Sequence, residues 1–110
     1  MLFRSGDTVE VRAHVWLDQM IVTRVRLRSI DAPELRAGCP EEARKAAAAR
    51  EALVTLLESG KIYLTGLGRD KYGGRVLGDL LTAEGHSIST HMLTTGHARP
   101  YAGGKRQGWC

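Results

Sequence analysis

Residues 25–34 read Val25-Arg-Leu-Arg-Ser-Ile-Asp-Ala-Pro-Glu34, a strand pattern that runs into an acidic turn. In its first half apolar side chains alternate with arginines, the period of two that directs one face of a strand into a core and the other outward. Pro33 cannot donate a ladder hydrogen bond, and it biases the residue before it toward extended geometry. We therefore expect the strand to stop at Ile30.

Two carboxylates, Asp31 and Glu34, fall on this turn, a few residues from the outward-facing Arg26. Carboxylates beside an arginine at the end of a rigid strand can hold a hard cation and a phosphate together. A surface turn with solvated charges explains the same residues equally well. The segment taken alone leaves both interpretations open.

The bulk properties indicate one soluble globular domain with a basic surface. The chain has 110 residues, 43% apolar and 25% charged, which is enough for a modest core and is not typical of disorder. Sixteen basic against 12 acidic residues give a net charge of +4, which favours a polyanionic partner such as nucleic acid. No run approaches the ~18 apolar residues that cross a bilayer, so we expect no membrane partner. The sequence shows no signal peptide and leaves the compartment open between secreted, periplasmic and cytoplasmic.

The pattern along the chain predicts a β-rich α+β domain. A helix over 40–58 begins with proline and two glutamates and stops before Gly60, and a shorter helix over 88–95 follows the capping residue Ser87. Glycines flank a predicted turn at 68–74. Strands are expected over 8–17, 20–30, 61–67 and 75–82, with an extended segment over 97–101 and a tail from 102 to 110. This order favours a small antiparallel barrel with two helices packed outside it.

The two cysteines, Cys39 and Cys110, fit no metal-binding spacing. They form either one bridge closing a long loop or two free thiols, and the sequence does not decide between them. The four histidines are scattered singly, so nothing indicates a zinc site. We expect both tryptophans, Trp16 and Trp109, to cover apolar surface.

Three segments, taken together, resemble the signatures of the staphylococcal nuclease (thermonuclease) family. They are Gly6-Asp7-Thr8, then the run from Arg26 to Glu34, then Asp70-Lys-Tyr-Gly-Gly-Arg75. They occur in the family's order and are separated by the expected helix, so the resemblance covers about residues 6–101 of a single domain. It implies an OB-fold, a five-stranded Greek-key barrel, and a calcium-dependent nuclease that hydrolyses phosphodiester bonds in DNA and RNA.

Carried over residue by residue, the resemblance implies calcium ligands at Asp7 and Asp31 and at the backbone carbonyl of Ala32. Calcium is a hard ion that takes six to eight oxygens in proteins, so carboxylates, a carbonyl, waters and a phosphate oxygen suit it. Asp7 has a second interpretation, because aspartate often hydrogen-bonds within its own turn.

The resemblance also implies catalytic roles for Glu34, Arg26 and Arg75. Glu34 would contact metal-bound water and orient or deprotonate the attacking water, and the two arginines would grip the scissile phosphate. Forked guanidinium groups match the equatorial oxygens of a reacting phosphate better than lysine does. Residues implied to bind the substrate are Lys71, Tyr72 and Tyr101.

The chain departs from the family at its start, where only residues 1–5 precede Gly6 and leave a short first strand. A first strand this short leaves a sheet edge exposed. We expect the exposed edge either to pair with a second copy, in a homodimer or by strand exchange, or to weaken the fold. The rival function from another class is a non-catalytic OB-fold that binds nucleic acid or protein without cutting.

Overall fold

The computed structural model describes residues 2–3, 6–14, 19–34, 38–58, 60–69, 75–105 and 108–110. Five strands form one sheet in the order β1-β2-β3-β6-β5, in which only β3 and β6 pair in parallel. The strands are β1 (Leu2–Phe3), β2 (Thr8–His14), β3 (Met20–Leu27), β5 (Ile62–Arg69) and β6 (Arg75–Thr82). A second, antiparallel sheet joins β4 (Ile30–Asp31) to β7 (Arg99–Pro100).

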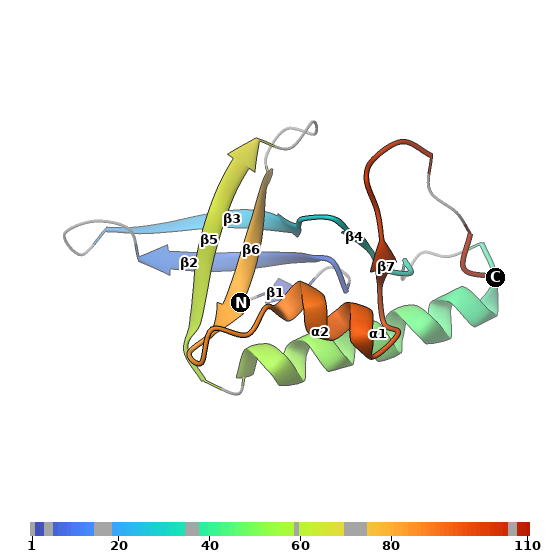
Figure 1. The fold of residues 1–110 in the computed structure, drawn as a ribbon. Coiled ribbons are helices and arrows are strands. Elements are labelled where there is room, and N and C mark those ends of the chain that lie inside the picture. The colour runs from blue at the N-terminus through green and yellow to red at the C-terminus, as the bar shows by residue number, and fades with distance from the viewer. Residues whose placement is uncertain are drawn as a thin grey trace.

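The sheet is bent, with β5 and β6 crossing β2 and β3 steeply (Figure 1). Among the described residues β1 and β5 stand at its two edges and do not pair with each other, so the predicted closed five-stranded barrel is not confirmed. The architecture is a β-rich α+β fold with an open, OB-like sheet. The homodimer expected from the β1 edge remains a prediction, which light scattering on the purified protein would test.

Two helices cover one side of the sheet (Figure 1). Helix α1 (Pro40–Glu58) has the predicted bounds, with two glutamates in its first turn, where the helix dipole favours negative charge. Helix α2 (Ile88–Thr94) begins at Ser87, whose hydroxyl accepts the Thr90 N–H at 3.2 Å. No helix in the described part of the chain is both long and apolar enough to span a bilayer.

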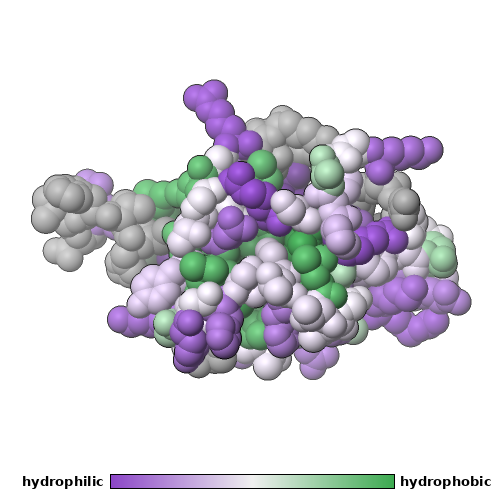
Figure 2. Space-filling view, viewed as in Figure 1, coloured by the Kyte–Doolittle hydropathy of each residue, from purple (hydrophilic) through white to green (hydrophobic). Residues whose placement is uncertain are grey.

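The core lies between the sheet and the helices. Alternate residues in the first half of β2 and the second half of β3 are buried as the period of two predicts, including Val9, Val25 and Leu27, and they meet Leu53 of α1 and Met92 of α2. Figure 2 shows apolar groups in the middle of one face and hydrophilic groups along α1. The core therefore joins the central strands to both helices.

Among the described residues, two predicted strand ends are wrong by two or more residues. The strand expected to reach Ile30 breaks at a two-residue turn, because Ser29 adopts a left-handed φ of 66° before β4 begins. The turn expected from Gly68 is still strand, since β5 continues to Arg69. In β5 the glycines make room for side chains: an added Cβ would lie 3.0 Å from Asp79 Oδ2 at Gly66 and 3.0 Å from Arg28 NH2 at Gly68.

Candidate functional site

Asp7, immediately before β2, is joined to the end of β3 and to the residue that follows β4. Its backbone carbonyl accepts the Leu27 N–H at 2.7 Å, and its side-chain Oδ2 accepts the Ala32 N–H at 2.9 Å. The other oxygen, Oδ1, accepts the Thr8 hydroxyl at 3.0 Å. The Asp7 carboxylate therefore lies, buried, against the peptide bond between Asp31 and Ala32, 25 residues away in the sequence.

The same Asp7 oxygen faces Arg26. The Arg26 NH2 group lies 3.7 Å from Asp7 Oδ2, and each of the two side chains is 12% exposed. Arg26 also donates from NH1 to the Leu27 carbonyl at 2.6 Å, which fixes the guanidinium near the strand end. Sequence-distant Asp7 and Arg26 are thus neighbours at the acidic turn, as the three segments predicted.

Arg75 lies on β6, the strand that pairs with β3. It is the first residue of β6 and is the register partner of Arg24 on β3, while Arg26 is opposite Leu77. Register partners point to the same side of a sheet, and residues two apart on one strand share a face. Arg24, Arg26 and Arg75 therefore occupy one face of the β3–β6 pair, with Arg75 beside Arg24, three residues before the Leu27 that binds the Asp7 carbonyl.

Asp31, on β4, is almost fully enclosed. Its side chain is 4% exposed, and its Oδ2 accepts the Trp109 indole N–H at 3.1 Å and lies 3.7 Å from Arg99 Nε. Arg99 is the register partner of Asp31 on β7, and its guanidinium stacks on Trp109, 4.0 Å from the ring centroid. A stacked arginine and an indole N–H thus converge on one oxygen of the proposed metal ligand.

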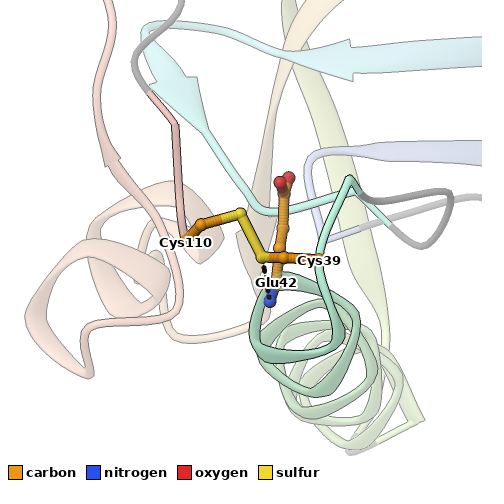
Figure 3. A group of neighbouring side chains, drawn as sticks. All are labelled: Cys39, Glu42 and Cys110. Carbon is orange, nitrogen blue, oxygen red and sulfur yellow. Dashed lines mark hydrogen bonds between the residues drawn. A yellow bond between two sulfur atoms is a disulfide. The ribbon is translucent and has the colours of Figure 1, made fainter.

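A disulfide holds this C-terminal segment in place. Cys110 is bonded to Cys39, with 6.2 Å between their Cα atoms and a sequence separation of 71. Figure 3 shows Cys110 meeting Cys39 at the first turn of α1, where the Glu42 N–H donates to Cys39 Sγ at 3.3 Å. The two cysteines therefore form a disulfide and are not the two free thiols that the sequence also allowed.

Glu34 lies at the exposed end of the turn. Its backbone N–H donates to Glu42 Oε2 at 3.0 Å, which ties the turn to the start of α1. Within the described segments, the only three metal-ligating atoms from His, Cys, Asp and Glu that lie within 4.8 Å of one another belong to Cys39, Glu42 and Cys110. Two of these are disulfide sulfurs and offer no thiolate, so this group is no soft-metal site.

The predicted substrate contacts are placed only in part. Lys71 and Tyr72 lie outside the described residues. Tyr101 follows β7, where its N–H donates to the Ser29 carbonyl at 2.9 Å and its hydroxyl to the Gly104 carbonyl at 2.5 Å. The Tyr101 side chain is therefore half-buried against the C-terminal segment.

The carboxylate and backbone oxygens at this turn are of the kind that a hard cation such as calcium takes as ligands. The buried Asp7 carboxylate is aimed at the backbone of Asp31 and Ala32, and the flanking cations are arginines that can also bind phosphate. Sequence reasoning missed Arg99 and Trp109, which contact Asp31 directly. The available signal was the cysteine pair, because a bridge from Cys110 to the loop after Asp31 places Trp109 beside that residue.

The comparisons with known proteins show the family of the chain. No curated protein matches the chain. The family model described as staphylococcal nuclease homologue matches residues 24–108. The match includes Arg26, Asp31, Glu34 and Arg75, whereas Asp7 precedes it and is a candidate through the Gly6-Asp7-Thr8 segment and its contacts with Ala32 and Arg26. Because the match covers well over half of the sequence, the chain belongs to the staphylococcal nuclease homologue family.

Proposed function

We propose that this protein is a calcium-dependent nuclease that hydrolyses phosphodiester bonds in DNA and RNA. The observation that carries the proposal is the convergence on Asp7 Oδ2 of the Ala32 N–H at 2.9 Å and Arg26 NH2 at 3.7 Å. The contact supports the proposal because Asp7, the backbone of Ala32 and Arg26, to which we assign cation and phosphate binding, come from separate segments of the chain. Members of this family are generally nucleases, which supports the same reaction class.

In the proposed mechanism the chain binds a cation through Asp7, Asp31 and the Ala32 carbonyl. Calcium, when bound, supplies a Lewis acid that neutralises charge on a phosphate oxygen. Burial of both carboxylates favours this use, since desolvated anions gain most from a cation partner. The two aspartates and the carbonyl therefore set the position of the phosphate relative to the acidic turn.

The arginines stabilise the charge that develops during attack. Arg26 and Arg75, on one face of β3 and β6, bind the non-bridging oxygens of the scissile phosphate. One arginine of this kind contributes about 10³–10⁵ in rate in phosphoryl transfer. Glu34, exposed at the turn, orients the attacking water and accepts its proton. No covalent intermediate with the protein is needed.

The primary test measures hydrolysis of a labelled single-stranded DNA and of an RNA of the same sequence, in calcium and in chelator. We expect cleavage in calcium and none in chelator. Equal rates in the two conditions, or no cleavage in either, contradict the proposal. Binding of uncut substrate in calcium, weakening steeply with salt, indicates instead the rival function of a non-catalytic nucleic-acid-binding module.

A second test asks whether the arginines act on the substrate. Arg26→Ala and Arg75→Ala should each slow turnover at least ~10²-fold while the folded state survives. Arg44→Ala is the matched control, because Arg44 is an exposed arginine on α1, outside the site. If the three variants lose activity to the same small extent, the phosphate-binding residues have been misassigned.

A further inference from the structure

The C-terminal residues meet Asp31 through a constrained set of contacts. The Trp109 indole N–H donates to Asp31 Oδ2 at 3.1 Å, and Arg99 Nε lies 3.7 Å from the same oxygen. Arg99 in turn stacks on the Trp109 ring at 4.0 Å. One hydrogen bond and one ion pair on the same oxygen, made by two side chains that stack on each other, restrict the rotation of the Asp31 carboxylate about its side-chain bonds.

Hydrogen bonds and a disulfide restrain the backbone before and after the Trp109 side chain. The carbonyl of Gly108 accepts from Arg99 NH2 at 3.0 Å, and the carbonyl of Trp109 accepts from Lys45 Nζ at 3.0 Å. The next residue, Cys110, is bonded to Cys39 at the start of α1 (Figure 3). The two hydrogen bonds are exposed and each contributes little, whereas the disulfide is covalent. The disulfide is therefore the principal restraint on the indole.

Carboxylates that ligate a metal are usually held by hydrogen bonds from residues that do not touch the ion. Such donors fix the orientation of the ligand, and losing one typically lowers metal affinity about 10–100-fold. The indole N–H suits this role at Asp31, because it donates a hydrogen bond without adding a charge that would repel the cation.

We propose that Trp109 is a positioning residue that orients Asp31 for a hard divalent cation, and that the Cys39–Cys110 disulfide holds it there. The proposal rests on the proposed function, in which Asp31 is a calcium ligand. It makes calcium affinity dependent on the disulfide, although neither sulfur touches the ion. Reducing agents then weaken cation binding through release of the indole.

The test is calorimetric titration of calcium into oxidised wild-type protein and into Trp109→Phe. Phenylalanine keeps a ring for Arg99 to stack on but removes the N–H donor, so we expect calcium to bind about 10–100-fold more weakly. The same loss is expected for Cys39→Ser/Cys110→Ser and for wild type in reductant. Thermal melts in chelator show that each variant is folded, and Arg44→Ala should bind calcium like wild type.

The outcomes separate this inference from the proposed function. Wild type that binds calcium with the same affinity as Trp109→Phe overturns the positioning role and leaves the nuclease intact. Tighter binding by Trp109→Phe also overturns it, because the indole would then compete with the cation. Wild type that binds no calcium overturns both proposals. Should Trp109→Phe fail to fold, the paired serine variant and the reduced wild type decide in its place.

Discussion

Replacing Asp7 should separate its part in the fold from its part in the chemistry. In Asp7→Asn the amide oxygen can accept the Ala32 N–H now bound at 2.9 Å, and the amide nitrogen can donate to the Thr8 hydroxyl now at 3.0 Å. Both local partners stay satisfied, so the free energy of unfolding should change by less than about 1 kcal/mol. The negative charge, however, is gone.

Asp7→Ala leaves those partners without an acceptor. The Ala32 N–H is buried, and a buried donor with no partner costs about 1–3 kcal/mol. For a domain of 110 residues the entropy of unfolding is roughly 0.23 kcal/mol/K, so the melting temperature should fall by about 4–13 °C. Arg26 keeps its bond to the Leu27 carbonyl and adds little to this cost.

Both variants lose the carboxylate that we assign to calcium, so both should bind calcium at least ~10²-fold more weakly than wild type and cut DNA correspondingly more slowly. The assay pairs a thermal melt in chelator with calcium titration and single-turnover cleavage. Wild-type cleavage by Asp7→Asn would refute the assignment of Asp7 to the cation. A large loss of stability in Asp7→Asn would refute the view that its hydrogen bonds, and not its charge, hold the segments together.

Two further predictions concern stability. Reducing the Cys39–Cys110 bridge, which spans 71 residues, should lower the free energy of unfolding by about 4 kcal/mol in the chain-entropy model, or roughly 15–20 °C in melting temperature; an unchanged melt in reductant would contradict it. Gly6→Ala should cost about 1–3 kcal/mol in denaturant unfolding, because its Cβ would lie 2.9 Å from the Ala49 Cβ on a packed helix. Gly60→Ala, which meets nothing within 4 Å, is its control and should be neutral or slightly stabilising.

Local signals predicted most of the elements because they act within a few residues. The proline and glutamates at the start of α1 and the glycine after its end define a helix of the predicted length. The alternation in residues 8–14 predicts which side chains of β2 enter the core, and Val9 and Val11 are buried accordingly. Neither feature needs information from elsewhere in the chain.

The turn predicted from Gly68 is wrong because side chains distant in the sequence pack beside the glycines of β5. Glycine beside strand residues usually marks a turn, yet here Gly66 leaves room for the Asp79 side chain and Gly68 for that of Arg28. Arg28 Nε and Asp79 Oδ2 lie 4.0 Å apart. The Arg28 NH2 group donates to the Gly66 carbonyl and so fills the space that a side chain would occupy. Whether such a glycine ends a strand therefore depends on residues that are far from it in the sequence.

The candidate site also depends on contacts between residues that are far apart in the sequence. The three signature segments predicted that Asp7 and Arg26 would meet, because each segment carries a charge whose role needs the others. Nothing in a nine-residue tail predicts that its tryptophan will bind Asp31, 78 residues earlier. That contact depends on the disulfide between Cys110 and Cys39, and the composition of the chain does not show whether this disulfide forms. Once the bridge forms, Trp109 is confined near the loop after Asp31, and the indole then has a carboxylate within reach. The part of the site that resisted prediction is thus the part that depends on oxidation.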